Sequence, residues 1–236
     1  MKNVVAIILA KGSSKEIPRK NLLDFCGKPL IAWSIIQAKK CKQISSVWIS
    51  SDDKEILKIG EEYGAKKIFR PQELVTDDAT SESGWLHGIE TIENNGEVID
   101  LVIGIQATSP IRESDDFTKA LEIFEKKNCD SMFSASKLKD FYIWNKTNNH
   151  EYKSVNYDYC DRKLRQNVQE QYVENGSFFI FKPENLRKNN NRLHGKIEIC
   201  EIDFWKSFQI DSYEDIEFCE TLMKHYLLRN KSLGKN

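Results

Sequence analysis

Short apolar runs alternate with segments of helical period from the start of the chain to about Ser136. Runs of a few valine, isoleucine and leucine residues are typical of strands that are buried on both faces of a parallel sheet. The predicted strands are Val4–Leu9, Val47–Ser50, Lys67–Phe69, Leu101–Gln106 and Ser131–Ala135. The segments between them predict helices that pack on this sheet.

Residues at the helix ends agree with this pattern. Pro29 opens the first predicted helix, Asp52 or Asp53 caps the second, and Gly64 ends the second. The predicted helices are Pro29–Lys40, Asp53–Tyr63, Ser81–Asn94 and Ser114–Lys127. The alternation predicts an α/β fold with a doubly wound, mostly parallel sheet. Right-handed crossovers then place the loops that follow the strands along one sheet edge, where ligands bind in such folds.

The alternation stops between Lys137 and Glu174, a polar stretch that contains aromatic side chains but no helical period. Order then resumes with a strand at Gly176–Phe181, a short helix at Pro183–Lys188, a strand at Lys196–Ile202 and a last helix at Glu214–Leu228. We therefore expect a single domain over residues 1–236. Residues 137–174 would form an excursion from it, either a flap or an arm for dimerisation.

Composition excludes several classes of partner. The 35 Lys and Arg against 36 Asp and Glu leave a formal net charge of -1, which offers no overall attraction to nucleic acid or to a membrane. The six cysteines include no C-x-x-C pair, so we expect buried free thiols in a reducing compartment. Because no apolar run suits a bilayer span or a signal peptide, we expect a soluble, cytoplasmic protein.

The segment Ala10–Asn21, directly after the first strand, combines small residues with the cations Lys11, Lys15, Arg19 and Lys20. Small residues let backbone N–H groups converge on phosphate oxygens, and cations neutralise a triphosphate. The spacing is neither that of a Walker A loop nor that of a dinucleotide-binding fingerprint. A solvated basic turn explains the pattern equally well, but the position after the first strand of a parallel sheet favours a phosphate cradle. We call Ala10–Asn21 the cradle.

The cradle and four further motifs follow one another in the order known from one enzyme family. The cradle fits the pattern A-R-x-x-S-K-x-I/L-P-x-K-N at Ala10, Ser14, Lys15, Ile17, Pro18, Lys20 and Asn21. The other matches are R-P-x-x-L-a-x-D at Arg70–Asp77 with Ser81, Q-P-T-S-P-L-R at Gln106–Arg112, R-Q and N-G at Arg165–Gln166 and Asn175–Gly176, and a closing segment at Ile210–Asp211 with Asp215. Over almost its whole length the chain resembles the acylneuraminate cytidylyltransferases, or CMP-sialic acid synthetases. Relatives in that family act on legionaminic, pseudaminic and Kdo-type acids.

The resemblance implies a Rossmann-like nucleotidyltransferase fold, a homodimer and a Mg²⁺-dependent reaction in surface glycan biosynthesis. In such enzymes the anomeric hydroxyl of a nonulosonic acid attacks the α-phosphate of CTP, and pyrophosphate leaves. The charge that develops on the phosphate oxygens must be compensated by positioned cations and the metal ion. The resemblance assigns catalytic roles to Lys11, Lys20 and Asp211, and it makes Asp211 the metal ligand.

Binding roles follow from the same resemblance. The implied nucleotide-binding residues are Ala10, Lys11, Gly12, Ser13, Ser14, Lys15, Lys20, Asn21, Arg70 and Ser81, and the implied substrate-binding residues are Gln106, Arg165 and Asn175. A planar guanidinium such as that of Arg165 can bind the sugar carboxylate through two hydrogen bonds. Plain alternatives exist: a helix N-cap for Ser81, a surface ion pair for Arg70 and a simple turn for Asn175. Asp215, near the start of the last predicted helix, is expected to interact with the helix N-terminus.

Several positions depart from the family pattern. Lys11 replaces an arginine, Glu16 replaces a glycine, and Trp144 replaces a lysine of the sialic-acid-specific members, which weakens the case for sialic acid itself. Gln209 occupies the first position of the family's D-x-D metal pair, which leaves Asp211 as the one carboxylate. Mg²⁺ tolerates this, because water and phosphate oxygens complete its shell.

Other functions stay open at this point. They are a CMP-Kdo-type or other sugar nucleotidyltransferase, a nucleotide-binding reductase or methyltransferase on the same fold class, and a non-catalytic descendant that binds nucleotide or sugar. The missing glycine fingerprint disfavours the reductase and the methyltransferase. The retained Asp211 disfavours the non-catalytic descendant.

Overall fold

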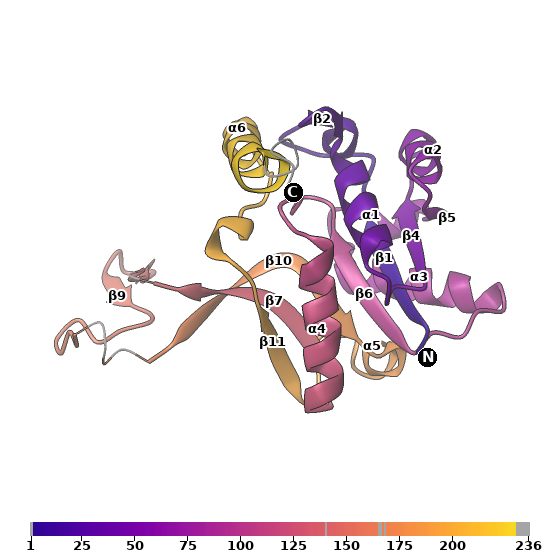
Figure 1. Cartoon of the computed structure of the whole chain (residues 1–236). Helices are drawn as coiled ribbons and strands as arrows, with labels where there is room; N and C mark the ends of the chain where they lie inside the picture. Colours follow the sequence, from indigo (N-terminus) through magenta and orange to yellow (C-terminus); the bar gives the residue numbers. More distant parts are fainter. Residues whose placement is uncertain (1, 140, 165–166, 168, 230–236) are drawn as a thin grey trace, which may run out of the picture.

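A seven-stranded sheet forms the centre of the computed structural model, which describes residues 2–139, 141–164, 167 and 169–229 (Figure 1). Its strands are β1 (Val4–Leu9), β4 (Ser46–Ser51), β5 (Lys66–Phe69), β6 (Leu101–Gln106), β7 (Ser131–Leu138), β10 (Gln171–Phe181) and β11 (Ile197–Glu201). Their spatial order is β11-β7-β10-β6-β1-β4-β5. Only β10 runs antiparallel to its neighbours, β6 and β7. The predicted doubly wound, mostly parallel α/β sheet is confirmed.

Helices cover both faces of the sheet, because successive strand residues point to opposite sides. The helices are α1 (Leu30–Lys40), α2 (Lys54–Glu62), α3 (Ser81–Asn94), α4 (Ser114–Lys127) and α5 (Pro183–Asn189). Ala6 and Ile8 of β1 pack into a core with α1, α2 and α4. Val5 and Ile7 pack into a second core with α3 and α5. Every residue of β1 is apolar because both faces of the strand are covered by helices.

A third apolar cluster lies beyond the carboxyl ends of the strands. It joins the short strand β2 (Asp24–Phe25), which pairs with β3 (Lys28–Pro29), and the start of α1 to α6 (Tyr213–Leu222) and to the π-helical segment η5 (Met223–Leu228). Ile17 of the cradle and Ile210 are both fully buried in this cluster. The cradle and the segment that leads into α6 therefore share one apolar anchor, although they are far apart in the sequence.

Most predicted element boundaries agree with the structure, and the differences have local causes. Pro29 is the residue before α1, and the predicted last helix changes from α to π geometry at Met223. β7 and β10 extend further than predicted, because Leu138 pairs with Gln171 and the antiparallel ladder satisfies backbone groups that lie outside the apolar pattern. Short 3₁₀ helices occupy Lys20–Leu22 (η1), Gln72–Leu74 (η2) and Phe204–Lys206 (η4).

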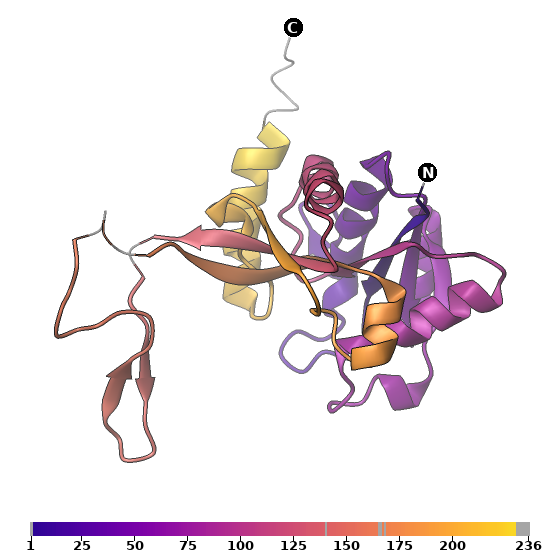
Figure 2. The same cartoon turned by 90° about the horizontal axis from the view of Figure 1, so that it is seen from below.

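Between β7 and β10 the chain leaves the sheet and carries the small hairpin of β8 (Trp144–Lys146) and β9 (Tyr152–Ser154), which stands away from the body (Figure 2). Aromatic contacts hold this region together. The ring centroids of Tyr142 and Tyr157 are 4.5 Å apart, and the guanidinium carbon of Arg162 lies 4.3 Å from the centroid of Tyr142. The predicted excursion at 137–174 corresponds to this region and to the adjoining ends of β7 and β10.

None of the helices in the described part of the chain is long and apolar enough to cross a membrane. All six cysteines are free. Cys41, Cys129, Cys200 and Cys219 are buried, as predicted, and Cys26 is half-buried. The expectation of burial is wrong for Cys160, which is exposed and lies in the excursion, where most of the described residues are exposed.

Candidate functional site

A hollow of about 280 Å³ lies at the carboxyl ends of β1 and β6. Residues from separate parts of the sequence line it. Among the predicted site residues, those in its wall are Lys11, Ser13, Ser14, Lys20, Asn21, Arg70, Ser81 and Gln106. The parallel sheet explains this convergence, because the loops after its strands meet at one edge.

Two hydrogen bonds fix the backbone of the cradle. The amide nitrogen of Gly12 donates to Oδ1 of Asp52 at 2.9 Å, and Nδ2 of Asn21 donates to the carbonyl oxygen of Lys11 at 2.8 Å. A Cβ atom at Gly12 would lie only 2.8 Å from Cβ of Asp53, so the loop approaches the end of β4 more closely than a side chain allows. Gly12 and the buried Asn21 thus shape the cradle, and Ala10, its first residue, is buried as well.

Acidic side chains pair with the cradle lysines. Nζ of Lys15 lies 2.8 Å from Oδ2 of Asp77, and Nζ of Lys11 lies 3.7 Å from Oδ1 of the same residue. The hydrogen bond and the charge of Lys15 are the largest influences that lower the pKa of the Asp77 carboxyl. Nζ of Lys20 lies 2.9 Å from Oδ1 of Asp211. Sequence reasoning included Asp77 in a motif but missed its role as a counter-ion.

The fourth cation of the cradle points elsewhere. Arg19 adopts a left-handed backbone conformation, with φ 57°. Its guanidinium donates to Glu55 of α2 at 2.5 Å and lies 3.8 Å from Asp53. Of the other cradle cations, Lys11 and Lys20 line the hollow, whereas Lys15 is not in its wall and pairs with Asp77.

Arg70 forms part of the hollow's wall, although it is only 5% exposed. One of its terminal nitrogens donates to the carbonyl oxygen of Ser50 at 3.2 Å. Nε of Arg70 and Oγ of Ser50 are buried and have no hydrogen-bond partner among the described residues. Burial lowers the pKa of Arg70, and the nearby Asp52 opposes this effect. Arg70 is therefore not a surface ion pair, and its unused donor suits a bound ligand.

Ser81 is the first residue of α3, but it is not the N-cap. The preceding residue, Thr80, fills that role, and its hydroxyl accepts a hydrogen bond from the amide of Ser83 at 3.2 Å. The helix-cap alternative for Ser81 is thereby excluded. Ser81 lies in the wall of the hollow, as Arg70 does.

Gln106 and Asn175 differ in their relation to the hollow. Gln106 ends β6 and lines the cavity. Asn175 is buried, and its side-chain oxygen accepts a hydrogen bond from Oγ of Ser134 at 2.7 Å, so its side chain faces β7. The structure therefore does not bring the Asn175 side chain into the hollow. Arg165, the third predicted substrate-binding residue, lies outside the described residues.

Arg112 is a buried residue that is hydrogen-bonded to the backbone of Gln106, a residue in the wall of the hollow. The sequence did not indicate this role, although Arg112 ends the Gln106–Arg112 motif. Burial lowers its pKa to about 9, against the effect of Asp116. Its guanidinium donates to the carbonyl oxygen of Gln106 at 3.1 Å and to Oε1 of Gln37 in α1 at 2.9 Å. Further bonds reach Ser34 and Ser177. This buried arginine therefore ties β6, β10 and α1 together below the hollow.

Asp211 and Asp215 have different environments. Oδ2 of Asp215 accepts hydrogen bonds from the amides of Asp211 and Ser212 at 2.9 and 2.7 Å, within a capping box at the start of α6. The prediction that Asp215 serves the helix terminus is confirmed. The Asp211 side chain is 66% exposed and faces Lys20. No cluster of three or more His, Cys, Asp or Glu side chains within the described ranges could hold a metal ion, so a cation at Asp211 would take its remaining ligands from phosphate and water.

Comparison with known proteins decides the family. A family model described as "Cytidylyltransferase" matches residues 5–233. The chain belongs to the cytidylyltransferase family. It is therefore a nucleotidyltransferase enzyme, and the hollow beside the cradle is the candidate active site of this cytidylyltransferase.

Relatives of this cytidylyltransferase carry related names. The pseudaminic acid cytidylyltransferase of Campylobacter jejuni is 32% identical over 246 residues, which cover 95% of this chain and 97% of that protein. An N-acylneuraminate cytidylyltransferase of Oncorhynchus mykiss is 34% identical over 183 residues, covering 76% of this chain but 41% of the longer fish protein. Among solved structures, CMP:2-keto-3-deoxy-manno-octonic acid synthetase complexed with CTP matches with a TM-score of 0.70 at 15% identity, covering 96% of this chain and all of that one (100%). This last likeness shows the fold alone.

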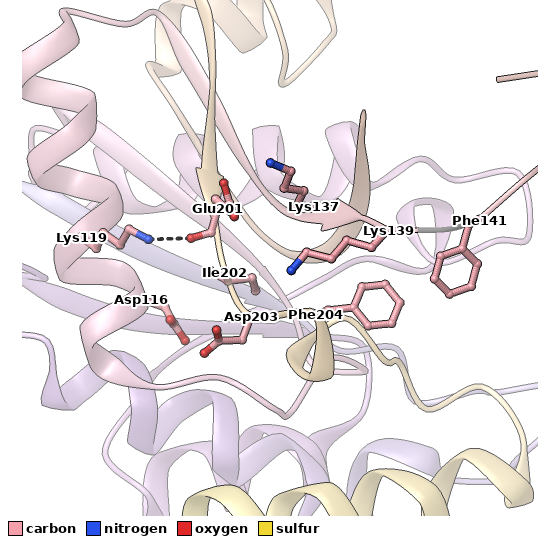
Figure 3. A pocket seen from close by; sticks show the side chains of 9 residues that line it. All are labelled: Asp116, Lys119, Lys137, Lys139, Phe141, Glu201, Ile202, Asp203 and Phe204. Atoms are coloured by element: carbon pink, nitrogen blue, oxygen red, sulfur yellow. Dashed lines mark hydrogen bonds between the residues drawn. The ribbon is translucent and has the colours of Figure 1, made fainter. Parts of the chain in front are cut away.

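A second hollow, of about 600 Å³, lies at the base of the excursion and holds none of the predicted site residues (Figure 3). Lysines and carboxylates alternate around it. Lys119 donates to the carbonyl oxygen of Glu201 at 2.7 Å, Lys137 pairs with Glu170, and Asp116 is held by Lys206. Because its charges compensate one another, this hollow offers no concentration of cations for a triphosphate.

Proposed function

We propose that this cytidylyltransferase transfers CMP from CTP to the anomeric hydroxyl of a nonulosonic acid. The hydroxyl oxygen forms a bond to the α-phosphorus, the bond from this phosphorus to the bridging oxygen breaks, and pyrophosphate leaves. The observation that carries the proposal is the convergence of Lys11, Lys20 and Arg70 with Gln106 around one hollow. The names of the relatives from Campylobacter jejuni and Oncorhynchus mykiss support a sugar acid as the acceptor.

The cationic residues in and beside the hollow would bind the phosphate groups of CTP. Lys11, Lys15 and Lys20 would bind the triphosphate, with backbone amides at Gly12–Ser14 as further donors. Lys11 and Lys20 would act in catalysis by neutralising charge as it develops on the phosphate oxygens. The ammonium group of Lys11 offers a point charge in place of the planar guanidinium of the family's arginine, and Glu16 is exposed.

Nucleoside recognition would come from the α3 side of the hollow. The unused Nε donor of Arg70 and the side chain of Ser81 lie in or next to the cavity wall. An acceptor on the cytidine would satisfy the buried donor, which costs free energy as long as it lacks a partner. Ala10 and Asn21 would contribute by shaping the cradle rather than by charge.

We propose Mg²⁺ as the cofactor and Asp211 as its protein ligand. The exposed carboxylate of Asp211 beside the triphosphate cradle is a hard oxygen donor, which Mg²⁺ prefers. This ion binds few protein carboxylates and keeps water and phosphate oxygens as its other ligands. When bound, the ion would neutralise phosphate charge and orient the leaving group. Lys20 lies beside Asp211 and would hold the same phosphates from the other side.

The acceptor would bind beyond Gln106, whose side-chain amide can donate and accept hydrogen bonds with hydroxyl, amide or carboxylate groups. We further propose that Arg165 binds the sugar carboxylate. Asn175 would act through its backbone and its bonds to β7, because its side chain is already engaged there. The proposed reaction requires CTP, and the six cysteines are free thiols, as is usual in a reducing compartment. Both facts favour the cytoplasm as the compartment of this protein.

We also propose one domain over residues 1–236 and a homodimer that uses residues 137–174 as an arm. Exposed apolar side chains on this segment support the proposal, among them Trp144, Tyr152 and Leu164. Such side chains on a projecting segment are typical of a surface that a partner covers. Small-angle scattering should give the mass of a dimer, and a monomer at high concentration would contradict the arm's role.

A pyrophosphate-release assay tests the proposed reaction. The protein is incubated with Mg²⁺, each of the four nucleoside triphosphates and a panel of sialic, legionaminic, pseudaminic and Kdo-type acids. We expect release only with CTP, and only with a nonulosonic acid. Absence of release with every pair, from a folded protein that binds CTP, would overturn the proposal in favour of a binding role.

A further inference from the structure

Gln209 joins two loops that border the proposed acceptor site. Its Nε2 donates to the carbonyl oxygen of Asn175 at 3.0 Å, and its Oε1 accepts from Oγ1 of Thr108 at 3.5 Å. The amide of the next residue, Ile210, donates to the carbonyl oxygen of Thr108 at 2.8 Å. Only the NH₂ group of an amide can donate to a carbonyl, so the bond to Asn175 sets the orientation of the Gln209 side chain.

The loop that Gln209 holds interrupts the regular pairing between β10 and β7. Pairing between β10 and β7 shifts register between Glu174 and Phe179. A shift of this kind leaves backbone groups without ladder partners, and they need partners from elsewhere. The carbonyl of Asn175 finds its partner in Gln209.

Gly176 links this loop to Gln106. Its φ of +65° lies in the left-handed region. A Cβ atom built on Gly176 would lie 2.6 Å from Oε1 of Gln106 and 2.7 Å from Nε2 of Gln209. Both glutamine side chains therefore pass directly over the same glycine, and the place of Gln106 depends on where Gln209 holds Gly176.

We propose that Gln209 is a positioning residue that sets Gln106 for the sugar acid and does not hold the metal ion. The inference rests on the proposed function, because it assigns a task at that site. The Gln209 amide has both of its polar atoms engaged with protein groups. A carboxylate here would set a negative oxygen against the carbonyl of Asn175, which explains why this chain carries an amide at this position.

Two variants of equal length separate positioning from metal binding. Gln209→Met keeps the shape of the side chain and removes both hydrogen bonds, whereas Gln209→Glu adds a carboxylate that can bind Mg²⁺. Both variants lose the hydrogen bond to the carbonyl oxygen of Asn175. For a positioning residue we therefore expect both to raise the KM for the sugar acid about tenfold, the effect of losing one hydrogen bond to a buried group. The CTP affinity and the Mg²⁺ concentration for half-maximal rate stay within about twofold of the wild type for Gln209→Met.

Controls make the outcome decisive. Gln43→Met alters an exposed glutamine after α1 and should leave every parameter unchanged, and melting temperatures report the folding of each variant. An unchanged sugar KM in Gln209→Met, together with a raised Mg²⁺ requirement, would overturn the inference. If the wild type turns over no sugar acid, the proposed function fails separately.

Calorimetric titration of CTP at several Mg²⁺ concentrations then tests whether Gln209 binds the metal ion. Loss of Mg²⁺-dependent CTP affinity in Gln209→Met contradicts the inference, and unchanged affinity supports it.

Discussion

The ammonium nitrogen of Lys20 lies 2.9 Å from Oδ1 of Asp211, although the two residues are 191 positions apart. The contact follows from packing of the residues beside them. Ile17 and Ile210 are fully buried in the same apolar cluster. This cluster places the cation of Lys20, in the wall of the hollow, beside the exposed carboxylate of Asp211, and this is the pair to which we assign the proposed binding of a metal ion and triphosphate.

Replacing the carboxylate of Asp211 should stop the reaction without unfolding the protein. Asp211→Asn keeps the shape of an exposed side chain, so we expect an unchanged melting temperature and a fall in kcat of about 100-fold or more, as for other charge-stabilising groups. Pyrophosphate release measures this fall. Glu214→Gln, a nearby exposed position in α6, is the matched control. Full activity in Asp211→Asn would refute the proposed metal role.

Asp77 should compete with CTP for the cradle lysines. Asp77→Asn removes the acidic partner of Lys15 and of Lys11, although Lys11 keeps its hydrogen bond to the carbonyl oxygen of Thr76. We expect CTP binding without metal to tighten about two- to fivefold, the range typical of exposed ion pairs. Calorimetry in the presence of EDTA measures this effect. Asp78→Asn, the adjacent exposed acid, should show a smaller change. Weaker binding of Asp77→Asn that occurs only with Mg²⁺ would instead identify Asp77 as a metal ligand.

Arg70 should contribute to nucleotide affinity through its planar group rather than through charge alone. Arg70→Lys keeps a cation but loses the Nε donor, so we expect CTP affinity to fall about tenfold. Equilibrium binding measures the loss, and Arg187→Lys in α5 controls for the exchange of an arginine elsewhere. Equal affinities of the wild type and Arg70→Lys would show that Arg70 is a structural residue only.

Lys206 should stabilise the fold by pairing with Asp116. Its side chain is 4% exposed, and its Nζ lies 2.8 Å from Oδ1 of Asp116. Lys206→Met leaves that carboxylate without its cation, which should lower the free energy of unfolding by about 3–5 kcal/mol. The double variant Lys206→Met/Asp116→Asn should recover a large part of the loss. Urea unfolding measures both, and equal losses in the two variants would contradict the pairing.

The same pair predicts a dependence on pH. Burial lowers the pKa of Lys206, but the charge of Asp116 and hydrogen bonds to Asp116 and Glu113 outweigh this and raise it above 10.5. A group whose pKa rises on folding stabilises the protein fully below its unfolded pKa and loses this effect as pH rises through the folded value. The difference in stability between the wild type and Lys206→Met should therefore be constant near neutral pH and shrink above pH 10.5. A constant difference throughout the alkaline range would contradict this assignment.

The secondary structure could largely be predicted from local pattern. The run Val4–Leu9 is a strand because its apolar residues face two cores, and Asp53 caps α2 with a side chain that accepts from the amides of Glu55 and Ile56. Prediction was poorest for Gln171–Glu174, which is polar and joins β10 only because β7 lies beside it. Pairing between distant segments leaves little trace in the composition of a polar strand.

The sequence by itself determined the order of strands and helices, the cradle after the first strand and the set of motifs that bind nucleotide and sugar in the family. These depend on short-range periodicity and on residue types at short spacings. Only the tertiary structure decided that Asp77 pairs with Lys15, that Arg112 ties β6 to β10, and that Gln209 holds Asn175. Such contacts arise where separate loops meet at one sheet edge, and the positions of those loops depend on the packing of the whole core.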